Sequence, residues 1–203
     1  MAAKPLGYPA AELATTPFPK TFLSPTRLVR ISAYTTGEPY FGASGANRFD
    51  APGAAAGSAH YAVCYLGTHL DVAIAESILH DEAPVDGAFR LTRAQIDGRY
   101  ALYFTGLRLH LLDLSGALLK RLGGSADLAG TTDYGLTQAW SQAVYANPAR
   151  YDGFLYMSRH LNTRRALALF DRAAHKIELD GYARLASAHG FRQALERFNI
   201  ALV

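Results

Sequence analysis

Residues 68–80 read THLDVAIAESILH and form the most informative stretch of the chain. At helical spacing Val72 and Glu76 share one face with other apolar side chains, so this carboxylate lies on the side expected to turn toward the interior or a cleft. Thr68 and Asp71 have the spacing of a capping box, which predicts a helix that begins just before this face. A glutamate at the edge of the stripe, leaning into solvent, is the simpler interpretation of these residues alone. The alternative is a functional acid, for which other parts of the chain must supply the evidence.

The residues around this helix predict short strands that alternate with a few helices. Strands are expected at 27–32, 61–66, 89–91, 100–104, 107–114, 154–158 and 166–170. Helices are expected at 71–80, 118–122 and 137–145. This alternation predicts an α+β domain whose sheets are mostly antiparallel.

Three regions differ in composition. Residues 1–26 are rich in proline, which predicts an extended arm over the domain. Residues 27–180 form the expected main domain, and within it the Gly- and Ala-rich stretch 37–58 is expected to be a long loop of the kind that covers a substrate. Residues 181–203 have a helical tendency and are expected to form a C-terminal helical extension packed on the same domain.

The composition is that of an ordered globular protein, with 50% hydrophobic and 18% charged residues in a chain of 203. No apolar run approaches the roughly 20 residues of a membrane span, and a signal-peptide core is missing, so we expect a cytoplasmic protein without membrane contact. The net charge is +3, but Lys and Arg are scattered, which argues against direct nucleic-acid binding. Cys64 is the only cysteine and is expected to act as a small hydrophobic residue within a strand.

Several motifs that define common enzyme classes are missing from the sequence. We find no P-loop, no Gly-x-Gly-x-x-Gly opening a helix, no His-Glu-x-x-His and no Gly-x-Ser-x-Gly, which argues against the P-loop, Rossmann, zincin and α/β-hydrolase classes. The seven histidines stand singly, and a lone histidine is more often structural than a ligand. We therefore expect no metal site.

Four residues could act with Glu76 on a dinucleotide. Arg30 and Arg48 could hold a pyrophosphate bidentately, and Tyr65 could stack on a nicotinamide ring. Glu76 beside the ribose could stabilise an oxocarbenium-like transition state as the carbon–nitrogen bond breaks. Because nicotinamide leaves as a neutral molecule from a cation, a single carboxylate is chemically sufficient. Each residue also has an ordinary explanation: solvated arginines, a core tyrosine and, for Ser158, the end of a strand.

At these residues the chain resembles the RES-domain toxins, a family named for an arginine, a glutamate and a serine. The resemblance rests on four blocks and their order, and it spans about residues 27–172. The blocks are LVRI (28–31), RFDAPG (48–53), VCYL (63–66) continuing through AIAE (73–76) to His80, and DGFLYMS (152–158) with ALFD (168–171).

The resemblance implies an ADP-ribosyltransferase-like fold that takes NAD as its substrate and cleaves the nicotinamide–ribose bond. It also implies a toxin of a type II toxin–antitoxin system, neutralised by an Xre-type DNA-binding antitoxin in a complex where the toxin could be a homodimer. The toxin would deplete NAD by hydrolysis or phosphorolysis. One alternative is a mono-ADP-ribosyltransferase that modifies a specific protein, and another is a catalytically silent module that binds a different phosphorylated ligand.

The resemblance also assigns roles by motif. Glu76 would be the catalytic acid residue, the two arginines at 30 and 48 would bind NAD, and Ser158 would complete the site. Tyr65 would contact the nicotinamide end. Because the connection between residues 52 and 61 is longer than usual in the family, Tyr61 remains the alternative to Tyr65.

Overall fold

The computed structural model describes residues 5–203, so the first four residues of the expected N-terminal arm lie outside the described part. The strands are β1 (Thr21–Leu23), β2 (Val29–Ser32), β3 (Val63–Gly67), β4 (Phe89–Leu91), β5 (Tyr100–Gly106), β6 (Leu109–Leu114), β7 (Gly153–Met157), β8 (Arg165–Phe170), β9 (Ile177–Arg184) and β10 (Ile200–Leu202). The α-helices are α1 (Glu12–Thr15), α2 (Leu70–Ser77), α3 (Arg93–Asp97), α4 (Ala117–Arg121), α5 (Asp127–Gly130), α6 (Tyr134–Ala146) and α7 (Phe191–Phe198). Short 3₁₀ turns are η1 (Pro25–Arg27), η2 (Ala54–Ala56), η3 (Asp171–Lys176) and η4 (Leu185–Ser187).

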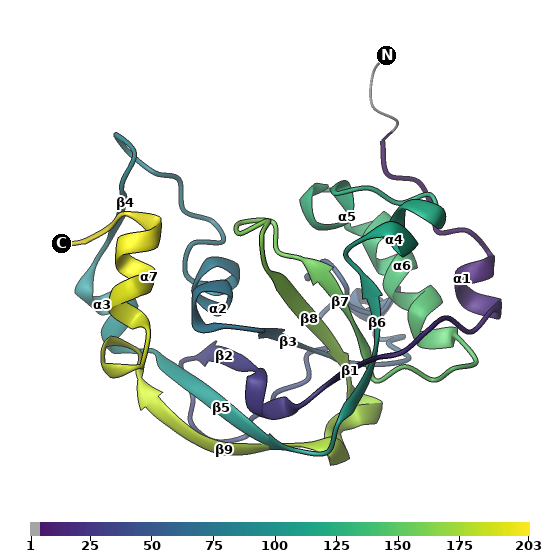
Figure 1. The fold of residues 1–203 in the computed structure, drawn as a ribbon, viewed down its shortest axis with the longest axis horizontal. Helices are drawn as coiled ribbons and strands as arrows, with labels where there is room; N and C mark the ends of the chain where they lie inside the picture. Colours follow the sequence, from purple (N-terminus) through teal and green to yellow (C-terminus); the bar gives the residue numbers. More distant parts are fainter. Residues whose placement is uncertain (1–4) are drawn as a thin grey trace.

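One curled sheet of eight strands, in the order β1-β6-β7-β8-β3-β2-β5-β9, forms the centre of the molecule (Figure 1). Its neighbouring strands are antiparallel except for the parallel pair β6 and β7. A separate parallel pair joins β10 to β4. The sequence-based prediction of a mostly antiparallel α+β fold is confirmed.

Alternation along the central strands assigns side chains to the two faces of the sheet. On β3, Val63 and Tyr65 face the cluster packed beneath α6, whereas Cys64 and Leu66 face the cluster on the other side. Both faces are therefore covered, which explains why these strands are almost continuously apolar. Burial raises the pKa of Cys64 to about 12, so the thiol is held in its neutral form, as expected for a small hydrophobic residue.

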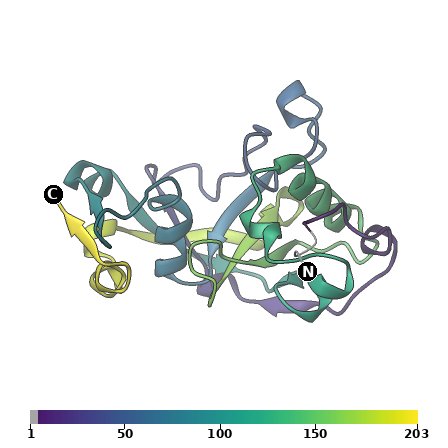
Figure 2. The ribbon, with the colours of Figure 1, turned by 90° about the horizontal axis from the view of Figure 1, so that it is seen from above.

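Helices cover the sheet in two groups at opposite ends, as the view from above also shows (Figure 2). The first group, α1, α4, α5 and α6, packs around Trp140, and the second, α2, α3 and α7, packs around Ile74 and Leu91. Helix α2 contacts both hydrophobic clusters: its Val72 belongs to the cluster of the first group and its Ile74 to the cluster of the second group. Residues on the C-terminal half of α2 therefore face the space between the two groups. No helix in residues 5–203 is long and apolar enough to span a membrane.

The two ends of the chain both add strands as well as helices. At the N-terminal end, β1 extends the sheet by pairing with β6, and α1 packs near α6, where Asn147 Nδ2 donates to the Thr16 carbonyl at 2.9 Å. At the C-terminal end, the boundary expected at residue 180 falls inside β9, which continues to Arg184 because it pairs with β5. Beyond the buried Ile177, its residues alternate between exposed and partly buried. The expected helix of this region is α7.

Candidate active site

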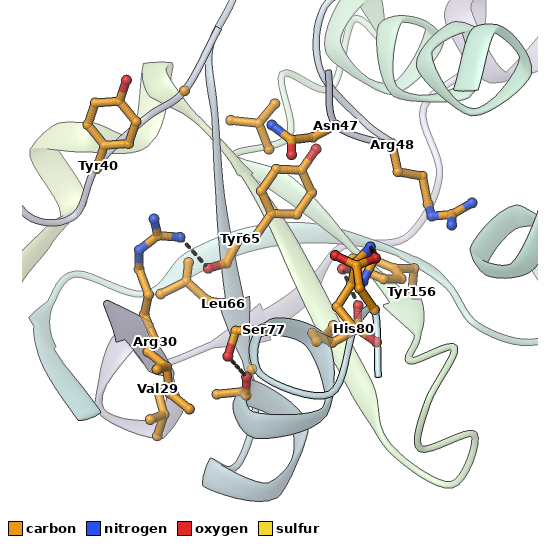
Figure 3. Close-up of a pocket in the computed structure, with 18 of the residues that line it drawn as sticks. Val29, Arg30, Tyr40, Asn47, Arg48, Tyr65, Leu66, Ser77, His80 and Tyr156 are labelled. Carbon is orange, nitrogen blue, oxygen red and sulfur yellow. Dashed lines mark hydrogen bonds and ion pairs between the residues drawn. The ribbon is translucent and has the colours of Figure 1, made fainter. Parts of the chain in front are cut away.

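A pocket of about 360 Å³ opens between the two groups of helices, within the size range of small-molecule sites. Arg30 and Arg48 lie on opposite sides of it, with Tyr65 between them (Figure 3). Glu76 of α2 also lines the pocket, so four of the six predicted site residues meet there. Ser158 reaches the site through Glu76, and Tyr61 does not line the pocket.

Helix α2 starts where β3 ends, and a glycine makes this close turn sterically feasible. A Cβ atom at Gly67 would lie 2.7 Å from the backbone nitrogen of Ala73 in α2, too close for any other residue without displacement of the helix. The predicted capping box is wrong: the N-cap is His69, and no side chain caps it. The Thr68 hydroxyl instead donates to the carbonyl of Arg165 at 2.7 Å, a contact made by the tertiary fold.

The Glu76 carboxylate is half-buried and has two hydroxyl partners. Ser158 Oγ donates to Glu76 Oε1 at 2.5 Å, and Tyr156 Oη lies 3.5 Å from Glu76 Oε2. Ser158 is 1% exposed, so its hydroxyl has little access to water. Burial raises the pKa of Tyr156, and the charge of Glu76 raises it further, so Tyr156 is a neutral donor at this position. The interpretation of Glu76 as a solvated residue at the edge of a helix is therefore wrong.

Arg48 is the most deeply buried cation of the pocket, at 9% exposure. Its Nη1 donates to the carbonyl of Thr131, and its guanidinium lies 4.9 Å from the ring centroid of Tyr134. Its Nη2 atom is buried without a hydrogen-bond partner. Burial lowers the pKa of Arg48, but an arginine keeps its charge at neutral pH, so a buried donor without an acceptor favours binding of an anion.

Arg30, in contrast, already has a counterion. Its Nε lies 3.0 Å from Glu38 Oε2, and the Glu38 side chain is 3% exposed. Its Nη1 donates to the carbonyl of Tyr65 at 3.0 Å, which fixes the guanidinium against β3. In the described part of the chain, Arg30 Nε makes no hydrogen bond, so its contact with Glu38 is an ion pair that positions and partly neutralises Arg30, whereas Arg48 Nη2 has neither a hydrogen-bond partner nor a counterion.

Tyr65 is held in place by the loop that also carries Arg48. Its hydroxyl donates to Asp50 Oδ1 at 3.1 Å and accepts from the backbone nitrogen of Phe49 at 2.9 Å. Asp50 is fully buried and also accepts a hydrogen bond from the backbone nitrogen of Asn47 at 3.2 Å. The segment 47–50 thus links Tyr65 and Arg48 into one rigid wall.

Tyr61 lies in the core behind this wall. Its hydroxyl donates to Ser141 Oγ at 2.9 Å, and its ring stacks on Tyr145 with a centroid distance of 4.4 Å. Burial raises the pKa of Tyr61 well above its ordinary value. The geometry favours Tyr65 as the tyrosine available to a ligand.

Two histidines lie close to Glu76. His80 lines the pocket, and its ring is 5.4 Å from that of His160, centroid to centroid. The Nε2 atom of His160 is buried without a partner. Burial lowers the pKa of His160, and Glu76 opposes this shift. Among residues 5–203, no three histidine, cysteine or acidic side chains gather into a group that could hold a metal.

Sequence reasoning missed three residues that shape the pocket: Tyr156, Glu38 and Tyr134. Tyr156 could have been found, because it lies two residues before Ser158 in the strand predicted at 154–158 and should share its face. Glu38 and Tyr134 carry no such signal: Tyr134 lines the pocket from the start of α6, and Glu38 acts on it through Arg30 from a loop whose path the sequence does not specify.

The fold of this chain and a stretch of its sequence resemble those of known proteins. No curated protein matches the chain significantly. Among solved structures, a chain of the M. tuberculosis MbcT-MbcA toxin-antitoxin complex has a TM-score of 0.56 at 12% sequence identity, covering 81% of this chain and 85% of that one. This likeness confirms the fold expected from the resemblance. Residues 25–187, more than half of the chain, match the RES domain. The protein therefore belongs to the RES domain family.

Proposed function

We propose that this protein is the toxin of a type II toxin–antitoxin pair, and that it depletes NAD by cleaving the nicotinamide–ribose bond. The observation that carries the proposal is the Glu76 carboxylate, held by Ser158 and Tyr156 in the same pocket as the free donor of Arg48. Membership in the RES family and the fold shared with a chain of a toxin-antitoxin complex support it.

The chemistry fits a site with one carboxylate. The bond from the ribose C1′ to the nicotinamide nitrogen breaks, and its electron pair goes to the pyridinium ring, which leaves as neutral nicotinamide. Positive charge then develops on the ribose, and Glu76 beside it supplies electrostatic stabilisation where the charge appears. A second acid to protonate the leaving group, as in ordinary glycosidases, is not required.

Arg48 and Arg30 contribute differently to binding of the diphosphate. Arg48 offers a buried, unpaired N–H, so it is the main contact for phosphate oxygens. Arg30 is paired with Glu38 and orients the backbone of Tyr65, so its contribution is positional as well as electrostatic. Tyr65 contacts the nicotinamide end in this proposal, which its position in the lining of the pocket supports.

The acceptor of the ADP-ribose is water or phosphate in this proposal. Transfer to a protein side chain is the competing outcome, and the same site chemistry would serve it. We further propose that an Xre-type antitoxin covers the mouth of the pocket with an acidic or apolar segment. A purified complex that turned over NAD at the rate of the free toxin would contradict that part.

The test compares nicotinamide release from NAD by the wild-type protein and by Glu76→Gln. We expect release to fall by about 10²- to 10³-fold, because the stabilising charge is lost while the shape is kept. Glu178→Gln, at an exposed position on β9, is the matched control and should release nicotinamide at the wild-type rate.

Three outcomes separate the candidate functions. Undiminished release by Glu76→Gln would refute the mechanism. Radiolabelled ADP-ribose that becomes protein-bound would favour the transferase over hydrolysis or phosphorolysis. Calorimetry in which NAD does not bind the wild-type protein would favour the catalytically silent module.

A further inference from the structure

A second cavity, of about 450 Å³, opens on the face of the sheet opposite the Glu76 pocket. Leu155 and Met157 of β7 line it, whereas Tyr156, between them, lines the Glu76 pocket. Because successive side chains of a strand point to opposite faces, the sheet itself separates the two cavities. The second cavity is lined by residues of β1 and of the loop between β7 and β8. A ligand could therefore occupy it without touching Glu76.

The rim of this cavity carries unneutralised positive charge. Arg27, Arg164 and Arg165 all line it, and only Arg165 has an acidic partner, Asp113. Within residues 5–203, neither Arg27 nor Arg164 has a carboxylate within ion-pair distance. Two guanidiniums that face one cavity without counterions match the geometry of a phosphate group, which each can hold bidentately.

His69, a neutral histidine beside Arg164, is a second reason to expect an anion at this rim. Its Nε2 lies 2.7 Å from Nη1 of Arg164. Because a guanidinium can only donate, the imidazole nitrogen must accept, and His69 is neutral in this arrangement. Burial lowers the pKa of His69, and Arg164 lowers it further. His69 is also the N-cap of α2, and the first turn of that helix has its own carboxylate, since Asp71 Oδ1 accepts from the backbone nitrogen of Val72 at 2.8 Å.

The remaining walls indicate what the phosphate would be attached to. Thr21, Ser115 and Thr163 offer hydroxyl groups, which suit a sugar. Leu23 and Met157 are partly exposed and offer an apolar surface for a base. An inorganic anion would leave these surfaces unused.

We propose that this cavity binds a nucleoside phosphate, with the phosphates against Arg27 and Arg164 and the nucleoside over Leu23 and Met157. The site is separate from the Glu76 pocket and does not depend on the proposed cleavage of NAD. It lies against the loop that carries Ser158, since the backbone nitrogen of Ser158 donates to the Arg164 carbonyl at 3.0 Å.

Met157 provides a direct readout, because the chain has only two methionines, Met1 and Met157. The full-length protein is labelled with [¹³C]methyl-methionine and titrated with ADP, adenosine and pyrophosphate, and the His69 ring is followed in parallel. We expect ADP to shift the Met157 methyl signal saturably and to raise the pKa of His69. Adenosine should leave both signals unchanged at the same concentrations, and pyrophosphate should bind more weakly than ADP.

Variants distinguish this site from the Glu76 pocket, to which ADP could also bind. In Arg48→Gln the Met157 shift should persist with unchanged affinity. In the double variant Arg27→Gln/Arg164→Gln the affinity should fall by about tenfold or more, since two charge-assisted contacts are lost. The exposed pair Arg90→Gln/Arg192→Gln is the matched control and should bind as the wild type does.

Four outcomes would overturn the proposal. They are a Met157 signal that ADP does not move, ADP affinity that survives loss of Arg27 and Arg164, adenosine binding as tightly as ADP, and pyrophosphate binding as tightly as ADP. Thermal melts of the double variant show whether it is folded. If it is not, the single variants Arg27→Gln and Arg164→Gln take its place, each with a smaller expected loss.

Discussion

Ser158 Oγ donates a hydrogen bond to Glu76 Oε1 at 2.5 Å, across 82 residues of sequence. Ser158 directly follows β7, and its Oγ also accepts from the backbone nitrogen of Leu161 at 3.1 Å, so the serine is fixed by its own loop. The carboxylate is thereby held by a group that cannot move independently of the sheet. In the proposed mechanism, Ser158 is therefore a positioning residue for Glu76.

Ser158→Ala should reduce the rate of nicotinamide release by about 10- to 100-fold, because small misplacement of a catalytic group is costly. The loss should appear in kcat, with KM for NAD nearly unchanged, since the arginines are untouched. Ser187→Ala, at an exposed position of η4, is the control and should behave as the wild type. An effect confined to KM would instead indicate that Ser158 contacts the substrate.

Tyr65→Phe and Tyr61→Phe should separate the two candidate tyrosines. Both variants lose a buried hydroxyl, and each should lower the free energy of unfolding by about 1–3 kcal/mol, measured by urea denaturation. Only Tyr65→Phe should also raise KM for NAD, because its hydroxyl holds the 47–50 segment that carries Arg48. If Tyr61→Phe raises KM and Tyr65→Phe does not, the assignment is reversed.

The parts of the fold that follow from local periodicity could be predicted from the sequence. Local periodicity predicted three elements correctly: the strand containing Tyr65, the paired strand at 166–170 and the helix containing Glu76. Alternation and helical spacing depend only on near neighbours in the sequence. The whole of β9 was missed, since its pairing with β5 depends on residues far away in sequence.

The candidate site depends even more on tertiary contacts that the sequence pattern does not predict. The sequence placed Glu76 on the correct face but left open whether it was solvated, because the decisive partner, Ser158, comes from another strand. Thr68 was expected to cap α2, yet its hydroxyl binds the Arg165 carbonyl. Where a side chain has several possible partners, tertiary contacts determine which partner it binds. Residue spacing in the sequence does not specify those contacts.

His160 should make stability depend on pH. Burial lowers its pKa in the folded state below the unfolded value of about 6.5. Between those two pKa values the unfolded state binds more protons, so the free energy of unfolding should rise with pH up to about 6.5 and then level off. The groups that influence His160 are Glu76, His80, Arg159 and Arg48.

Urea denaturation of His160→Gln between pH 5 and 8 measures this contribution. The variant should show a shallower rise of the free energy of unfolding than the wild type. Some rise should remain, because the pKa of His69 is also lowered by burial. His60→Gln, at an exposed position, is the control and should follow the wild-type curve. Identical curves for wild type and His160→Gln would show that His160 does not contribute.

Gly67→Ala should impair both folding and catalysis. An added Cβ would lie 2.7 Å from the Ala73 nitrogen and 2.9 Å from the His69 carbonyl oxygen, and both are backbone atoms that cannot rotate away. Relief requires α2 to shift, which should cost about 1–3 kcal/mol of the free energy of unfolding. The same shift should move Glu76 away from Ser158. It should lower kcat by a larger factor than it changes KM. Gly181→Ala, with open space around its Cβ, is the control. Wild-type kcat in a destabilised Gly67→Ala protein would mean that the position of α2 does not limit catalysis.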